Sequence, residues 1–215
     1  MDLKLTGHNV IITGGTKGIG RAIAETLAEE GCNIAICARN ADDVSSAVAS
    51  LSAKGVKVTG QALDVADGDA FAAWINSVGE ELGGIDAFVS NVSGGNAPGD
   101  AGWISQFNYN ILSAVHGVEA CKPFFEKSSN ASVVMISTTA ALEHFMNAGP
   151  YNAMKAGLLN YSGALSQELG AKGVRVNAIS PGPVFIEGGS WDKIKQGMTA
   201  FYDSTLATIP LGRMG

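Results

Sequence analysis

Six short apolar runs alternate with longer amphipathic stretches in this chain of 215 residues. The runs lie at residues 9–13, 33–38, 57–63, 87–91, 132–137 and 174–179. Helical patterns lie between them, at about residues 18–30, 41–53, 67–82, 101–125 and 149–171. Apolar strands separated by helices predict a parallel sheet covered on both faces, which is the doubly wound α/β architecture. Ligands bind such sheets at the carboxyl ends of the strands.

The chain is expected to form a single domain over residues 1–215. Its length suits one large domain, and no internal repeat, linker or low-complexity tract divides it. A last helical pattern at residues 191–206 follows the final strand, so we expect residues 183–209 to form a substrate loop or lid. Residues 210–215 have the composition of a loop that leads into a further element, yet the sequence ends there.

The composition argues against several classes of protein. A net charge of -6 disfavours nucleic-acid binding, which needs a basic face. No apolar run is long enough to span a membrane, and the first residues lack the layout of a signal peptide, so we expect a cytoplasmic protein. The 3 cysteines are odd in number and lack ligand spacing, which predicts neither a disulfide framework nor a metal site.

The first apolar run ends in a glycine-rich turn with the sequence Thr13-Gly14-Gly15-Thr16-Lys17-Gly18-Ile19-Gly20. A helical pattern begins inside this turn. Unpaired backbone N–H groups and the helix dipole then point to the same spot, which makes an anion site. The arrangement predicts that Gly14 and residues 16–20 bind a phosphate group of a nucleotide, the alternative being a plain tight turn.

Two positively charged side chains near this turn bear on how the adenosine end of a dinucleotide is recognised. An acid about 20 residues past the glycines would favour a free 2′-hydroxyl, but the second strand ends in Ala38 and Arg39 instead. Arg39 and Lys17 would flank a 2′-phosphate, although both could also be solvated surface charges. Asp64, followed by Val65 after the third strand, is expected to contact the adenine or to cap a helix.

A phenol and an ammonium group occur four residues apart in the segment Tyr151-Asn152-Ala153-Met154-Lys155. Within a helix this spacing places both groups on one face. The ammonium stabilises the phenolate, so Tyr151 can give a proton to a carbonyl oxygen, or take one in the reverse direction. The alternative is an ordinary amphipathic helix with chance spacing. A nucleotide site and a proton-transfer site in one domain predict an enzyme.

Together these motifs resemble the classical short-chain dehydrogenase/reductase family, over residues 3–215. The glycine turn matches the family's cofactor loop, and Tyr151 with Lys155 matches its catalytic pair. The resemblance implies a Rossmann fold, a nicotinamide cofactor, and reversible oxidation of an alcohol or reduction of a carbonyl. It also implies that Lys155 binds the nicotinamide ribose and that Asn110 holds a water in the proton relay.

Further expectations follow from the same resemblance. Asn91 and Val184 are expected at the cofactor, and the turn at Pro181 and Gly182 is expected to support the nicotinamide. The basic pair near the glycine turn resembles the branch of the family that prefers NADP(H) over NAD(H). Family members pair the helices that correspond to residues 101–125 and 149–171 across a two-fold axis, which implies a homodimer or homotetramer.

The sequence departs from the family's pattern in four places. Thr138 replaces the catalytic serine and is expected to hold the substrate oxygen, either alone or together with Ser137 just before it. The family's Asn-Asn-Ala-Gly element appears as Ser-Asn-Val-Ser at residues 90–93, and Ile186 replaces a threonine that often contacts the cofactor. A last helix and a last parallel strand, which the family usually has, are missing from the sequence.

The expected reaction moves a hydride between NADP(H) and a carbonyl or secondary alcohol of a small to medium organic molecule, as in 3-oxoacyl reductases. The pocket for this molecule is expected to be apolar with polar groups at its border, from Phe145, Met146, Phe185, Trp191, Glu143 and His144. The alternative is a cofactor-binding sensor or scaffold that has lost turnover. The replaced serine, the altered element at residues 90–93 and the early end of the sequence favour that alternative, and the intact Tyr151, Lys155 and Asn110 oppose it.

Overall fold

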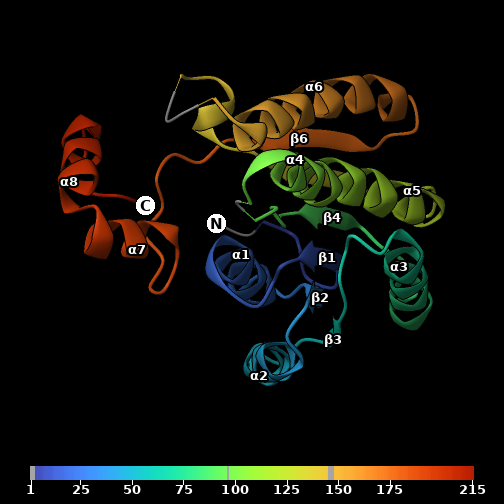
Figure 1. Ribbon diagram of the computed structural model, residues 1–215. Helices are drawn as coiled ribbons and strands as arrows, with labels where there is room; N and C mark the ends of the chain where they lie inside the picture. Colours follow the sequence, from blue (N-terminus) through green and yellow to red (C-terminus); the bar gives the residue numbers. More distant parts are fainter. Residues whose placement is uncertain (1–2, 96, 145–147) are drawn as a thin grey trace.

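Six parallel strands form one sheet with helices on both faces in the computed structural model of the protein (Figure 1). The structure describes residues 3–95, 97–144 and 148–215. The strands are β1 (Asn9–Thr13), β2 (Asn33–Ala38), β3 (Val58–Ala62), β4 (Ala87–Ser90), β5 (Ser132–Ile136) and β6 (Arg175–Ile179). The α-helices are α1 (Gly18–Glu29), α2 (Ala41–Ser52), α3 (Gly68–Leu82), α4 (Gly99–Phe107), α5 (Ser113–Phe125), α6 (Pro150–Gly170), α7 (Ser190–Gly197) and α8 (Thr199–Thr208). The shorter turns are the π-helical η1 (Asn108–Leu112) and the 3-10 helical η2 (Thr139–Ala141).

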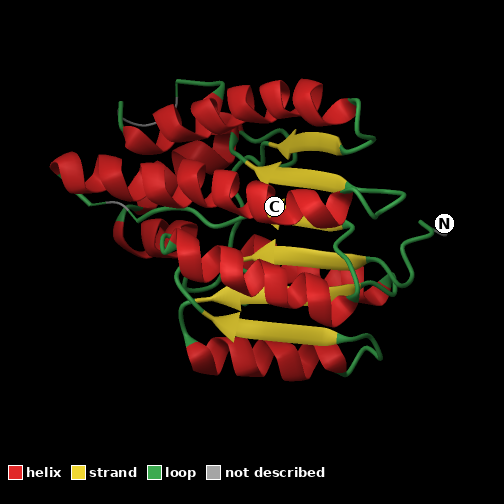
Figure 2. Ribbon diagram, turned by 90° about the vertical axis from the view of Figure 1, so that its right-hand side faces the viewer, coloured by secondary structure: helices red, strands yellow, loops and turns green. Residues whose placement is uncertain are grey.

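The strand order is β3-β2-β1-β4-β5-β6, and every neighbouring pair is parallel. The prediction of a doubly wound parallel sheet is therefore confirmed, and Figure 2 shows the arrows pointing the same way. After β3 the chain crosses back to pair β4 with β1, so the order reverses between these two central strands. The loops that follow β1 and β4 diverge at such a reversal, which is where this architecture binds ligands.

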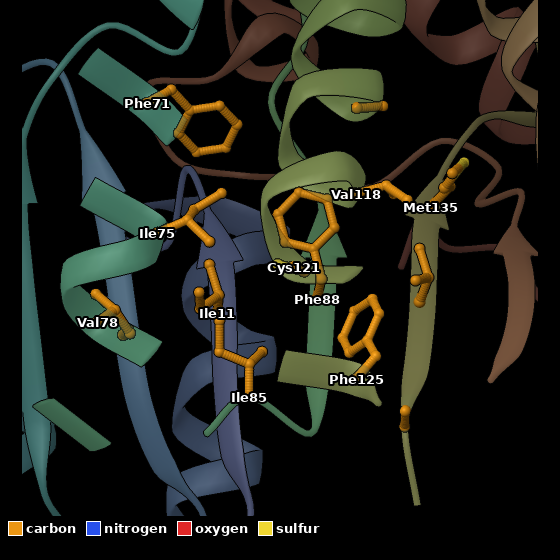
Figure 3. Close-up of a cluster of buried hydrophobic side chains, with 14 of the residues drawn as sticks. Ile11, Phe71, Ile75, Val78, Ile85, Phe88, Val118, Cys121, Phe125 and Met135 are labelled. Carbon is orange, nitrogen blue, oxygen red and sulfur yellow. The ribbon is translucent and has the colours of Figure 1, made fainter. Parts of the chain in front are cut away.

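Successive side chains of the central strands point to opposite faces of the sheet, and they pack into two separate hydrophobic cores. In β1, Ile11 faces the core beneath α3 and α5, whereas Val10 and Ile12 face the core beneath α1 and α2. Figure 3 shows the first core, in which Ile11 and Phe88 lie among side chains of α3 and α5. Burial on both faces explains why these strands appear in the sequence as continuous apolar runs.

The strand β6 forms one edge of the sheet, and β3 forms the other. The strand β6 pairs with β5, and in the described part of the chain no strand pairs with its outer side. Its residues are exposed or only partly buried, and Ile179 is 52% exposed.

Two of the predicted helices are divided in the structure. The pattern at residues 101–125 becomes α4, η1 and α5, one helical column with a π-helical turn inside it. The pattern at residues 191–206 becomes α7 and α8, because Met198 between them has φ -140° and ψ 52°, outside the helical region. The sequence analysis expected one continuous helix in each of these places and missed both breaks.

Candidate active site

The glycine-rich turn joins β1 to α1 at the centre of the sheet (Figure 1). Gly14 has a φ of 65°, which glycine adopts without steric cost. A Cβ atom on Gly20 would lie 2.3 Å from the carbonyl oxygen of Gly14, so only glycine lets the helix begin this close to the turn. No side chain caps the N-terminus of α1, and its N–H groups remain available to an anion. The turn therefore fits the phosphates of a dinucleotide.

Asn91, just after β4, links the glycine-rich turn to β4 by hydrogen bonds. Its main-chain N–H donates to Oγ1 of Thr13 at 2.9 Å, and its Nδ2 donates to the carbonyl of Thr13 at 3.0 Å. The same Nδ2 also reaches the carbonyl of Gly14 at 3.4 Å. Asn91 was predicted to lie at the cofactor, and the structure places its side chain against the backbone of the glycine turn.

A polar cluster lies beside the carboxyl ends of β2 and β3. The guanidinium of Arg39 lies over the ring of Tyr109, 5.8 Å from its centroid. The Tyr109 hydroxyl donates to Oδ2 of Asp64 at 2.7 Å, and this hydrogen bond to a carboxylate raises the pKa of Tyr109. The other carboxylate oxygen of Asp64 accepts from the N–H of Ala66 at 3.0 Å. The side chain of Val65 is buried in the core, which leaves only its backbone to face a cofactor.

Lys17 is paired with an acid of the neighbouring helix. Its Nζ lies 2.7 Å from Oδ2 of Asp43, in the first turn of α2, and the two side chains are 72% and 33% exposed. A phosphate beside Lys17 would therefore compete with a partly solvated carboxylate. The sequence analysis missed both Asp43 and Tyr109. The helix cap formed by Asn40, which accepts from the N–H of Asp43, could have placed Asp43 in that turn, whereas no motif marked Tyr109.

Lys155 lies inside the protein and is only 2% exposed. Its Nζ donates to the main-chain carbonyl of Ile136 at 2.7 Å, at the end of β5. Burial lowers the pKa of Lys155 to about 8. Tyr151 precedes it by one turn of α6 and is partly exposed. The helix therefore carries the phenol at the surface of the site with the amine buried below it.

The two hydroxyl groups that follow β5 have different surroundings. Ser137 is buried, and its Oγ donates to the main-chain carbonyl of Lys155 at 3.1 Å. Thr138 is partly exposed, and its Oγ1 accepts from the N–H of Ala140 at 3.3 Å, which caps η2. The Thr138 hydroxyl can still donate to another oxygen, whereas the hydroxyl hydrogen of Ser137 is already used.

Asn110 lies in the π-helical turn η1, which packs against α6. It is 1% exposed, and its Nδ2 donates to the main-chain carbonyl of Gln106 at 3.0 Å and to the side-chain Oε1 of the same residue. Its Oδ1 is buried, and it has no hydrogen-bond partner among the described residues. Such π-helical turns are frequent at functional sites, and this one brings a buried amide oxygen toward the helix of Tyr151 and Lys155.

A cavity of about 360 Å³ lies beside η2 and the start of α6. Its lining consists of residues 140–144 together with Ala148, Asn152 and Ala156. Glu143 and His144 border it as predicted, and the expected pocket residues Phe145 and Met146 lie outside the described residues.

The other two expected pocket residues lie elsewhere. Trp191 of α7 stacks on Phe201 of α8, with ring centroids 6.0 Å apart, and Phe185 meets Tyr202 edge-on at 6.5 Å. These rings join the two helices of the expected lid, which stand to one side of the sheet in Figure 1. Phe185 and Trp191 therefore do not line the 360 Å³ cavity.

The segment after β6 connects the site to α1. The carbonyl of Pro181 accepts from the N–H of Thr139 at 3.0 Å, which ties this turn to η2, and Gly182 follows it. Val184 lines a separate apolar groove of about 670 Å³ between α1 and the open edge of the sheet. A Cβ atom on Gly18 would lie 2.7 Å from Cδ1 of Ile186, so Ile186 lies directly on the cofactor turn.

Other kinds of site receive no support in the described residues. They contain no group of three or more His, Cys, Asp or Glu side chains that could hold a metal ion. Among the described helices, none is long and apolar enough to cross a membrane. Cys32, Cys37 and Cys121 are buried free thiols, and burial raises the pKa of Cys32 to about 11.

Proton transfer beside a dinucleotide-binding turn is characteristic of oxidoreductases that use a nicotinamide cofactor, and the fold and site define that class. A family model described as short chain dehydrogenase matches residues 8–189, and the chain belongs to this family. It is therefore an NAD(P)-dependent oxidoreductase acting on carbonyl or alcohol substrates.

Known relatives span nearly the whole chain. Isoepoxydon dehydrogenase of Penicillium expansum is 36% identical over 98% of this chain and 83% of its own length. A 3-oxoacyl-(acyl-carrier-protein) reductase of Chlamydia muridarum is 33% identical over 100% of this chain and 87% of its own. The crystal structure of L-sorbose reductase from Gluconobacter frateurii, complexed with NADPH and L-sorbose, has a TM-score of 0.90 at 28% identity, covering 100% of this chain and 87% of that one.

Proposed function

We propose that this protein uses NADPH to reduce the carbonyl of a small to medium organic molecule, or NADP to oxidise the corresponding secondary alcohol. The observation that carries the proposal is the buried amine of Lys155, fixed to the end of β5 one turn below Tyr151. Burial of an amine costs free energy, and titratable groups with such perturbed surroundings cluster at functional sites. Here the amine supports a phenol that can act as a general acid or base.

The chain's own residues would handle the substrate oxygen and its proton. Tyr151 would give a proton to the carbonyl oxygen, and the hydroxyl of Thr138 would hold that oxygen by donating a hydrogen bond. Lys155 would stabilise the phenolate that forms, and the buried Oδ1 of Asn110 would accept a hydrogen bond in the relay that returns the proton. The nicotinamide, when bound, supplies or accepts the hydride.

A preference for NADPH is proposed from the charges near the adenosine end. The residue that follows β2 is Arg39, in place of the acid that would favour a free ribose 2′-hydroxyl. The guanidinium of Arg39 lies over the ring of Tyr109 and carries five N–H donors, more than its contacts with the Tyr109 side chain use, so donors remain for a 2′-phosphate. L-sorbose reductase, to which the chain is similar, was solved with NADPH.

The substrate is proposed to enter the 360 Å³ cavity beside η2, where Glu143 and His144 are the polar groups. The names of the relatives above supply the test compounds, which are isoepoxydon, L-sorbose and a 3-oxoacyl-(acyl-carrier-protein). Residues 183–209, with α7 and α8, would form the movable cover of the site, and the protein is proposed to be cytoplasmic.

The test is a panel of these carbonyl compounds with NADPH and with NADH, followed at the absorbance of the reduced nicotinamide. We expect turnover with at least one compound and a lower dissociation constant for NADPH than for NADH. Equal affinity for both cofactors would contradict the NADPH preference. Tight NADPH binding without turnover on any compound would instead support the alternative, a cofactor-binding sensor or scaffold.

We also propose a homodimer or homotetramer. On α4, Trp103, Ile104 and Phe107 are 46%, 61% and 42% exposed, which is unusual for three large apolar residues on two turns of one helix. The neighbouring α6 exposes small residues such as Ala153, Ala156 and Gly157, so a second copy of these helices could approach closely.

A further inference from the structure

Gln106 of α4 is completely buried, which is rare for a glutamine and requires that its amide be hydrogen-bonded. Its Nε2 donates to the carbonyl of Gly94 at 2.9 Å and reaches the carbonyl of Gly95 at 3.3 Å. Its Oε1 accepts from Nδ2 of Asn110. One side chain therefore joins the loop after β4 to the buried amide of the proposed relay.

The hydrogen-bond partners of Gln106 fix the orientation of its own side-chain amide, and through it the orientation of the Asn110 amide. The carbonyls of Gly94 and Gly95 can only accept, so Gln106 must direct its NH₂ group toward them. The Oε1 of Gln106 then faces Asn110, so Asn110 must direct its own NH₂ group toward Gln106. The Oδ1 of Asn110 is thereby left as the buried acceptor without a partner among the described residues. The main-chain carbonyl of Gln106 accepts from the same NH₂ group at 3.0 Å, so the loop, acting through the Gln106 side chain, adds a second constraint on which atom Asn110 presents.

The loop lies directly on the helix at this point. A Cβ atom on Gly94 would lie 2.9 Å from Cα of Gln106 and 2.9 Å from the carbonyl oxygen of Ser105. The same loop begins at Asn91, whose side chain holds the glycine turn. Gln106 is therefore connected, through the loop, to the cofactor turn and, through its oxygen, to Asn110.

We propose that Gln106 is a positioning residue, which fixes the amide of Asn110 for proton transfer and holds the loop at Gly94 and Gly95. The proposal rests on the proposed function for the role of Asn110. It explains why a polar side chain occupies a fully buried position on α4, where an apolar residue would pack without needing partners.

The first variant is Gln106→Met, which keeps an unbranched side chain of similar length and removes every hydrogen bond of the amide. We expect kcat with the carbonyl substrate to fall at least about tenfold, which is part of the roughly 10²- to 10⁴-fold that a general acid–base group contributes. The KM for that substrate should stay within about twofold, because Gln106 does not contact the substrate. The matched control is Gln61→Met, at an exposed glutamine of β3, which should leave both constants unchanged.

The second variant is Gln106→Glu, which tests the hydrogen-bond pattern itself. A neutral carboxyl group can donate to the glycine carbonyls and accept from Asn110, so it can replace the amide, whereas an ionised carboxylate can only accept. The kcat of this variant should match the unmutated protein at low pH and fall as the pH rises. If Gln106 had only a structural role, Gln106→Glu would change the thermal stability without making kcat fall further as the pH rises.

An NMR measurement decides the positioning independently of turnover. In ¹⁵N-labelled protein, the side-chain amide proton of Asn110 should move upfield in Gln106→Met, because the bond to Oε1 is lost.

Normal kcat in folded Gln106→Met, an unchanged pH profile in Gln106→Glu, or an unchanged Asn110 resonance would overturn the proposal. If Gln106→Met does not fold, the pH profile and the NMR spectrum of Gln106→Glu take its place. No turnover by the unmutated protein would refute the proposed function, and the resonance would still decide the positioning.

Discussion

Lys155 and Ile136 are joined by a hydrogen bond of 2.7 Å, from the side-chain amine of α6 to the main-chain carbonyl at the end of β5. A second bond runs the other way, from Oγ of Ser137 to the main-chain carbonyl of Lys155 at 3.1 Å. The two bonds anchor the helix of Tyr151 to the strand that leads into Thr138. The relative positions of the Tyr151 phenol and the Thr138 hydroxyl therefore depend on three buried residues, Ile136, Ser137 and Lys155.

The first prediction concerns Tyr151. Tyr151→Phe removes the acidic proton and leaves the aromatic ring, so turnover should fall by about 10²-fold or more. The dissociation constant for NADPH, measured by nicotinamide fluorescence, should change little. Tyr161→Phe is the matched control, at a partly buried tyrosine of the same helix. A Tyr151→Phe protein that keeps most of its rate would exclude this residue as the proton donor.

The second prediction concerns the pH dependence of stability. The pKa of Lys155 is about 8 in the folded protein and 10.5 as its ordinary value. Between these values the unfolded chain holds a proton that the folded protein has lost, so the free energy of unfolding rises with pH. Below pH 8 both states carry the charge, and the cost of burying it is fully present.

Lys155→Met provides the reference for this measurement. The free energy of unfolding of the unmutated protein, relative to that of the variant, should increase by about 3 kcal/mol from below pH 8 to above pH 10.5. Urea titrations at several pH values measure this difference. A difference that stays constant over the whole range would show that the amine is not buried in the folded protein.

The third prediction concerns the ion pair between Lys17 and Asp43. Asp43→Asn removes the carboxylate that competes with a 2′-phosphate, so NADPH should bind about two- to fivefold more tightly, the range expected for a partly exposed pair. NADH affinity should change less. Asp42→Asn is the control, because the neighbouring Asp42 is exposed and has no ion pair in the described structure. Equal gains from both variants would point to general charge reduction instead.

The fourth prediction concerns the exposed apolar residues of α4. If the proposed interface includes them, Ile104→Asp should dissociate the assembly into monomers at micromolar concentration, as measured by light scattering. Leu211→Asp is the control, since Leu211 is 77% exposed and lies outside α4 and α6. A monomeric unmutated protein would remove the basis for this prediction and for the proposed oligomer.

The sequence predicted the parts of this structure that depend on local patterns. The six strands lie within the apolar runs, and Tyr151 and Lys155 share α6, because both features follow from the period of one element. Contacts between distant parts of the chain carry no such signal. Tyr109 and Asp64 are 45 residues apart, and Gln106 meets Gly94 twelve positions away only because the loop folds back on α4.

The last prediction separates Ser137 from Thr138. The sequence left open whether one or both hydroxyl groups serve the substrate. In the structure the hydroxyl of Ser137 is committed to the main-chain carbonyl of Lys155, whereas Thr138 is partly exposed and can still donate. Ser137→Ala should therefore lower the free energy of unfolding by about 1 kcal/mol through the lost hydrogen bond, with a smaller effect on turnover.

Thr138→Ala should lower turnover strongly and the free energy of unfolding only slightly, the reverse of Ser137→Ala. Turnover should fall by about 10²-fold, because a hydrogen bond to the substrate oxygen matters most in the transition state, while the free energy of unfolding changes little. Thr138→Ser should retain activity, since it keeps the hydroxyl and removes only a methyl group. Steady-state kinetics and urea titrations of the three variants make the comparison. An inactive Ser137→Ala beside an active Thr138→Ala would mean that Ser137 holds the substrate and that the Lys155 contact breaks when substrate binds.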